Sequence, residues 1–157
     1  TQAKTLFPYT TLFRSAIYYV LVQIVGGTIG VFIANLMFNR KAIDPSTYGR
    51  SGNYLFLAEV VATAELILII HLLRHQNRGH MTAGVLAAWI GTAYFFTSST
   101  SFANPAITFA RSWSDTFSGI SLKSVPLFIL AQVIGAALGV LLTALLTAEK
   151  KEEDVFA

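Results

Sequence analysis

Four apolar segments constrain the fold of this chain, because each is close to the length needed to cross a lipid bilayer. Ala16–Phe38 and Val125–Thr147 each run for 23 residues without a charged side chain, and about 20 apolar residues suffice for a spanning helix. Tyr54–Leu73 is of similar length, and Met81–Thr97, with 17 residues, lies at the lower limit. The pattern predicts an all-α membrane protein with four spanning helices.

The composition supports this class and excludes several others. The 157 residues are 54% hydrophobic and only 12% charged, whereas about a quarter of a soluble domain is charged. The absence of cysteine excludes disulfides and thiolate chemistry. The net charge of +3 is small, and the basic residues lie in the connectors, so no nucleic-acid partner is expected. Without clustered nucleophiles, metal ligands or a phosphate loop, we expect neither an enzyme nor a cofactor.

A short helix is predicted to start between the third and fourth spans. Asn104 is a favoured N-cap residue, and Pro105 stands at the first helical position, where proline is well tolerated. We expect a half-helix from Pro105 to about Ser112 that dips into the membrane. Since lipid cannot satisfy the free N–H groups at its start, Asn104 would cap them and present its amide NH₂ group to a passing solute.

An internal repeat links the first and last spans. The segment "VQIVGGTIGV" (22–31) is similar to "AQVIGAALGV" (131–140), at a constant offset of 109 residues. Each copy contains a GxxxG spacing, which allows helix backbones to approach closely. We therefore expect tight helix contacts at four glycines: Gly26, Gly30, Gly135 and Gly139. The match of Gln23 with Gln132 favours duplication over the chance similarity of two apolar helices.

The repeat predicts that most of a first half is missing. The second copy closes a unit of three spans and one half-helix, and no such unit precedes the first copy. In addition, "TLFPYTTLFRS" (5–15) is the in-frame translation of a widely used sequencing-adapter DNA. We therefore expect a non-native leader at 1–15, a partial membrane domain at 16–147 and a charged tail at 148–157.

These features resemble the aquaporin/glycerol-facilitator (major intrinsic protein) family. The resemblance rests on the order of elements, the duplication, and Asn104, Pro105 and Ala106 opening a half-helix; the string "SSTSFANPAITFARSWSDTFSGI" (98–120) is similar to the corresponding loop of a bacterial branch. It covers 16–147 and makes the spans the third to sixth helices of the family. The first two helices and the first half-helix would then be absent.

The resemblance implies an aquaporin-like helical bundle and a function. That function is a passive channel for water or small neutral solutes, such as glycerol or metalloid hydroxides. It would be a multi-pass protein of the inner (plasma) membrane, with the lipid bilayer and the solutes as partners, and the full-length protein would form a homotetramer. Two alternatives stay open at this point: a secondary transporter, which also uses broken helices, and a fragment that does not function.

One departure from the family concerns the selectivity filter. The family usually carries an arginine directly after Asn-Pro-Ala, but here that position is Ile107, and the nearest arginine is Arg111. Helical spacing puts both on one face, with Arg111 about 6 Å nearer the mouth. The other visible filter positions are Thr92 and Ser101. We expect a filter that is wider and less selective for water.

Two glutamates lie within the second span, where a carboxylate is costly and normally faces protein. The resemblance makes Glu59 a buried acceptor for the loop around the half-helix; the alternative is a helix-end glutamate at the membrane interface. Glu65 lies deeper, and we expect a structural hydrogen bond there. A transporter would need a coupling-ion site, and Glu65 is the only deep charge.

Overall fold

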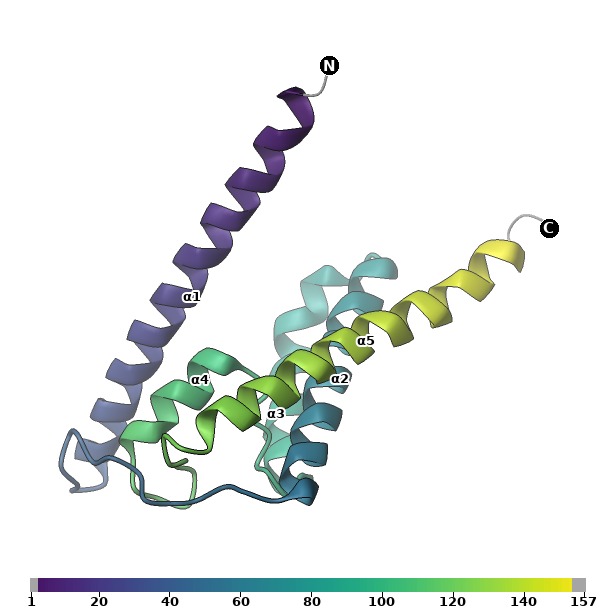
Figure 1. Cartoon of the computed structure of the whole chain (residues 1–157). Helices are drawn as coiled ribbons and strands as arrows, with labels where there is room; N and C mark the ends of the chain where they lie inside the picture. The colour runs from purple at the N-terminus through teal and green to yellow at the C-terminus, as the bar shows by residue number, and fades with distance from the viewer. Residues whose placement is uncertain (1–2, 154–157) are drawn as a thin grey trace.

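The computed structural model describes the backbone of residues 3–153 and the side chains of residues 14–148, and in this part of the chain the regular structure is entirely helical (Figure 1). The elements are α1 (Ala3–Met37), α2 (Asn53–His75), η1 (Gly79–Met81), α3 (Thr82–Phe96), α4 (Pro105–Ala110), η2 (Arg111–Trp113) and α5 (Val125–Glu153). The all-α class predicted from the apolar segments is confirmed.

Among the residues that the structure describes, three helices are long and apolar enough to span a membrane: Arg14–Met37 within α1, α2, and Val125–Ala148 within α5. The fourth predicted span, Met81–Thr97, forms a shorter helix than expected. α3 has 15 residues and is about 22 Å long, which is less than the ~30 Å of a bilayer core. It is short because η1 precedes it and because Thr97, its C-cap, is already extended at φ −93° and ψ 137°.

The most extensive helix contact is between α2 and α5, which cross in Figure 1. Two glycines of α5 allow this approach. A methyl group placed on Gly139 would lie 2.6 Å from the carbonyl oxygen of Ala64, and one on Gly135 would overlap the carbonyl oxygen of Val60. The second GxxxG spacing therefore lies at a close helix contact.

The first GxxxG spacing does not make such a contact, which corrects the expectation for Gly26 and Gly30. A methyl group on either would meet no atom within 4 Å among the described residues. The neighbouring Gly27 faces the half-helix instead, with Ala110 Cβ 3.2 Å from such a methyl group. The reason is that the rest of the described chain covers little of α1: 6% of its most apolar stretch is buried, against 33% of the corresponding stretches of α2 and α5.

The helix bounds do not mark the domain boundaries expected at either end. α1 begins at Ala3 and passes Ser15 and Ala16 without a break, and α5 continues through the start of the charged tail to Glu153. Extending an existing helix costs far less than nucleating one, so a helix end need not coincide with a change of composition. Packing of most of the leader and of the tail lies outside the described side chains.

The core lies beside the loop that leads into α4. Its apolar part is a cluster of Leu55, Phe102, Ile120, Val125 and Phe128, in which the rings of Phe102 and Phe128 are 5.4 Å apart. Many of the most buried side chains are nevertheless polar, among them Glu59, Ser99, Thr108, Ser112 and Gln132. Buried polar groups must be hydrogen-bonded to be tolerated, and their partners define the candidate site.

Candidate functional site

The half-helix begins at the predicted residue and is capped as its sequence requires. Asn104 is extended, at φ −153° and ψ 121°. Its Oδ1 accepts hydrogen bonds from the backbone N–H groups of Ala106, at 2.8 Å, and Ile107, at 3.3 Å. Pro105 follows at the first helical position, where its missing N–H costs nothing. α4 and η2 together run to Trp113, close to the expected end at Ser112.

The loop before the half-helix is strained. Thr100, Ser101 and Ala103 have φ values of +63°, +44° and +48°, in the left-handed region that side chains other than glycine disfavour. Each such residue costs about 1–3 kcal/mol. The surrounding contacts must therefore hold this loop in place.

Glu59 of α2 supplies those contacts. It is fully buried, and its carboxylate accepts hydrogen bonds from Ser99 Oγ at 2.7 Å, Phe102 N at 2.8 Å and Ala103 N at 3.0 Å. Two of these donors are backbone N–H groups of the strained loop, which lies outside any helix. Charge-assisted bonds are stronger than neutral ones, so a carboxylate offsets the strain. Glu59 therefore lies inside the protein, as a buried acceptor for the loop.

Gln132 of α5 is a site residue that sequence reasoning used only as a repeat marker. Its Nε2 donates to Glu59 Oε2 at 2.9 Å and to Thr108 Oγ1 at 2.8 Å. Thr108 in turn donates to the backbone carbonyl of Asn104 at 2.8 Å. A chain of hydrogen bonds thus runs from α2 through α5 to the cap of the half-helix. A glutamine repeated in two otherwise apolar spans was the available signal.

The matching glutamine of α1 also reaches the half-helix. Asn104 Nδ2 donates a hydrogen bond to Gln23 Oε1 at 3.3 Å. This bond occupies one of the two amide protons of Asn104, so the second remains available to a solute. The two members of the repeat therefore contact the half-helix from α1 and from α5.

The expected filter residues are spread over three elements. Thr92 is exposed on α3, and its hydroxyl donates to Ala88 O at 2.8 Å. Ser101 is buried in the strained loop, and its Oγ has no hydrogen-bond partner among the described residues. Ile107 is half-buried on α4, with its Cδ1 beside Gly27 of α1.

Arg111 faces a different neighbour from Ile107, although helical spacing predicts a shared face. Its guanidinium lies 4.3 Å from the Phe102 ring centre and 5.9 Å from that of Tyr94. Its Nη1 is buried without a partner in the described part of the chain. A 3₁₀ turn begins at Arg111, where α4 ends. Arg111 thus stands over the loop and α3, and Ile107 stands against α1.

Arg50 is a second residue that sequence reasoning missed. It is 2% exposed and donates from Nε to Gly119 O at 2.7 Å, from Nη1 to Ser99 O at 3.0 Å and from Nη2 to Phe117 O at 2.6 Å. Burial away from water lowers the pKa of Arg50, while an arginine stays charged in proteins. Its charge lies 5.0 Å from the Phe102 ring. An arginine in a polar connector gives no sequence signal that it will be buried and will hold three backbone carbonyl groups.

Glu65 makes the kind of contact expected for it. Trp89 Nε1 of α3 donates to Glu65 Oε2 at 3.3 Å. The bond is long for an N–H···O contact and joins two neighbouring helices. Glu65 is half-buried and takes no part in the network around Glu59.

Comparison with known proteins adds one match. The chain is 38% identical over 123 residues to the aquaglyceroporin AqpS of Rhizobium meliloti, and the match covers 78% of this chain and 52% of AqpS. The chain therefore spans about half the length of this curated relative. No protein-family model and no solved structure matches the chain.

Proposed function

Because the chain belongs to the aquaporin/glycerol-facilitator (major intrinsic protein) family, we propose that it contributes half of the pore of a passive channel for small neutral solutes. The observation that carries this is the half-helix start. Asn104 caps the half-helix with its Oδ1, donates one amide N–H to Gln23 and keeps the other free. Behind it, Glu59 accepts from the N–H of the preceding Ala103, and Gln132 donates to Glu59 and to Thr108 of the half-helix. A passive channel needs such donors fixed at one place, because they replace the water around a passing solute.

The proposed pore is completed by a segment related to the part of AqpS that this chain does not cover. The exposed flank of α1 supports this, since only 6% of its apolar stretch is buried. The residues opposite Asn104 would come from that segment. We propose that the whole protein lies in the inner (plasma) membrane and forms a homotetramer.

The side chains at the proposed filter positions favour the passage of solutes larger than water. Ile107 supplies an apolar wall where an arginine would add a fixed charge and five donors, and Thr92 and Ser101 are small. Arg111, which leans over Phe102, belongs to the wider mouth. We propose that glycerol-sized neutral solutes and metalloid hydroxides pass, and that ions are excluded by the cost of dehydration.

The experiment uses a chimera in which residues 16–157 are joined to the part of AqpS that this chain does not cover. Stopped-flow swelling of proteoliposomes would compare glycerol and water entry. Ile107→Arg is expected to reduce glycerol entry at least about tenfold, with a smaller effect on water, since a bulky charge narrows the filter. Arg111→Ala, the matched control, should change glycerol entry less than about threefold.

Two results would count against this placement of the filter. One is a native chimera that passes water but no larger solute. The other is a loss of selectivity in Arg111→Ala alone, which would make Arg111 the filter arginine. Chimeras must first be shown to insert and fold, by size-exclusion chromatography and circular dichroism.

A further inference from the structure

Arg50 lies near the end of the connector between α1 and α2, and its guanidinium joins the loops on both sides of the half-helix. Its Nη1 donates to Ser99 O, in the loop before α4, at 3.0 Å. Its Nε donates to Gly119 O at 2.7 Å and its Nη2 to Phe117 O at 2.6 Å, in the loop after η2. The two loops are therefore linked through one side chain as well as through the half-helix itself.

The position of Arg50 is set by the start of α5. Its backbone N–H donates to Ser124 Oγ at 3.1 Å, and Tyr48 O, two residues earlier, accepts from the N–H of Ser121 at 2.8 Å. The connector is thus paired with the segment that leads into α5, a helix that packs against α2. Arg50 therefore has a fixed reference point in the helix bundle.

The loop before the half-helix is held at one residue from two sides. Ser99 accepts a hydrogen bond from Arg50 at its carbonyl oxygen and donates one to Glu59 from its hydroxyl group, at 2.7 Å. The Arg50 guanidinium also lies 5.0 Å from the ring centre of Phe102, within the range of a cation–π contact. Arg111 lies against the same ring, at 4.3 Å. A movement of this loop would therefore displace the ring that Arg111 contacts at the mouth.

The loop after the half-helix is packed closely at the residue that Arg50 binds. A methyl group on Gly119 would overlap the carbonyl oxygen of Ser114 and would lie 2.7 Å from Ser46 Oγ of the connector. The N–H of Gly119 donates to Thr116 O at 2.8 Å. Arg50 thus ties the strained loop to a loop that is itself held against the connector.

The guanidinium group suits this role because of its shape. It carries five N–H donors in a rigid planar fork, whereas the ammonium group of lysine is a point charge on a flexible stem. Here all three nitrogens of the fork donate, each to a different carbonyl oxygen. The three oxygens must therefore keep a fixed separation, which Arg50→Lys would release while it keeps the positive charge.

We propose that Arg50 is a positioning residue that sets the width of the channel mouth, because it holds the loops on either side of the half-helix at a fixed separation. In its effect on solutes, this role rests on the proposed function. Release of the loops should widen the mouth and weaken discrimination by solute size. Asn104 keeps its own contacts with Gln23 and with the half-helix, so glycerol should still pass.

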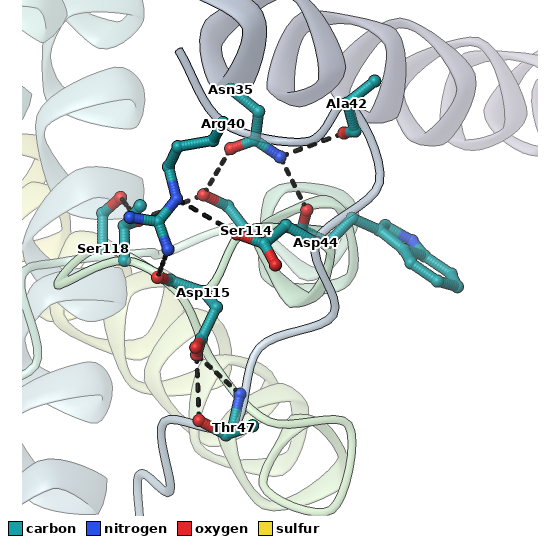
Figure 2. A network of polar contacts seen from close by, with 10 residues as sticks. Asn35, Arg40, Ala42, Asp44, Thr47, Ser114, Asp115 and Ser118 are labelled. Carbon is teal, nitrogen blue, oxygen red and sulfur yellow. Dashed lines mark hydrogen bonds and ion pairs between the residues drawn. The ribbon is translucent and has the colours of Figure 1, made fainter. Parts of the chain in front are cut away.

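The first test compares glycerol with erythritol, a neutral polyol that is one CHOH group longer, by stopped-flow swelling of proteoliposomes containing the chimera. Arg50→Lys is expected to raise the ratio of erythritol to glycerol entry at least about threefold, since the diameter of a pore limits what it passes. Arg40→Lys is the matched control in the same connector. Arg40 is exposed and donates to Asp44 Oδ2 and to Asp115 O (Figure 2), on one side of the half-helix, so the ratio should stay unchanged.

A second measurement follows the loops without any flux. Amide hydrogen exchange is measured by NMR on the purified 157-residue chain in lipid nanodiscs. Arg50→Lys should speed exchange at least about tenfold at Phe102, before the half-helix, and at Gly119, after it, since both loops lose the same support. Arg40→Lys should leave the Phe102 amide unchanged.

Three results would overturn the proposal. They are an entry ratio that is unchanged or lower in Arg50→Lys, an equal fall in the entry of both solutes, which is what a merely structural role would give, and faster exchange in one loop alone. Faster exchange in both loops, with a native chimera that conducts neither solute, would instead count against the channel and leave the link between the loops standing.

Discussion

The side-chain amide of Gln132 donates a 2.9 Å hydrogen bond to the carboxylate of Glu59, which joins α5 to α2 behind the half-helix. The same carboxylate holds two backbone N–H groups of the strained loop. The half-helix start is therefore fixed by a buried acceptor on one spanning helix and a donor on another. Its position depends on helix packing as well as on its own cap.

Replacing the acceptor should release the loop. Glu59→Gln removes the charge and turns an NH₂ group toward donors, so that at least one backbone N–H of Phe102 or Ala103 loses its partner. A buried unsatisfied group of this kind costs about 3 kcal/mol. Unfolding of the chain by SDS titration in mixed micelles measures that loss. Glu65→Gln is the matched control, since Glu65 accepts one long bond, and it should change the free energy of unfolding by less than about 1 kcal/mol. Equal losses in the two variants would contradict the role assigned to Glu59.

The glycine contacts predict opposite effects in the two repeat copies. Gly139→Ala puts a methyl group 2.6 Å from Ala64 O and 2.8 Å from Ile67 Cβ, which should cost about 1–3 kcal/mol through displacement of α5. Gly26→Ala meets no atom within 4 Å and should raise helix stability by up to about 1 kcal/mol. The same SDS titration compares them. Equal tolerance of both changes would argue against the close α2–α5 contact.

The contact between Thr47 and Asp115, which joins two connecting loops, should be lost at low pH. Asp115 Oδ1 accepts hydrogen bonds from the backbone N–H of Thr47, at 2.8 Å, and from its hydroxyl, at 3.0 Å (Figure 2). These bonds lower the pKa of Asp115 below its ordinary value of 3.8. A lowered pKa in the folded state means that the contact stabilises the loop above pH 3.8, and that this is lost as the pH falls through the lowered value.

Titration by NMR checks the acid dependence through the Thr47 amide resonance. That resonance should shift at a pH below 3.8 in the native chain, and the shift should vanish in Asp115→Asn. A titration midpoint at or above the ordinary carboxyl pKa of 3.8 would mean that Thr47 does not stabilise the charged form of Asp115. Asp44, which pairs with Arg40 at 3.1 Å, provides the comparison through Asp44→Asn, which should leave the Thr47 titration in place.

Much of the fold follows from local sequence rules, because a spanning helix and a capped helix start are specified by adjacent residues. Of the four spans predicted from the apolar runs, three correspond to helices of spanning length in the described residues. Asn104 with Pro105 predicted the half-helix to within one residue of the end of η2. Length alone overstated Met81–Thr97, since the 3₁₀ turn before α3 and the extended Thr97 after it shorten the helix.

The parts that were missed depend on contacts between distant residues. Gln132 acts through partners 73 and 24 positions away, and Arg50 through partners 49–74 positions away. The repeat marked Gln132 as unusual without indicating its partners, and a loop arginine gives no such signal. The same holds for the two GxxxG copies, which are alike in sequence. Within the described residues, only the glycines of the copy on α5 lie against another helix. The GxxxG spacing therefore indicates that a close helix contact is possible, but it does not predict that one forms.

A passive channel and a secondary transporter differ in what drives glycerol through the chimera. Flux into proteoliposomes would be measured over a wide range of glycerol concentrations, with and without an imposed sodium or proton gradient. For a passive channel, we expect a flux that rises in proportion to the glycerol gradient, does not change with either ion gradient and is accompanied by no ion current. Uptake that saturates, and that accumulates glycerol against its own gradient when a sodium or proton gradient is imposed, would contradict it and identify a secondary transporter.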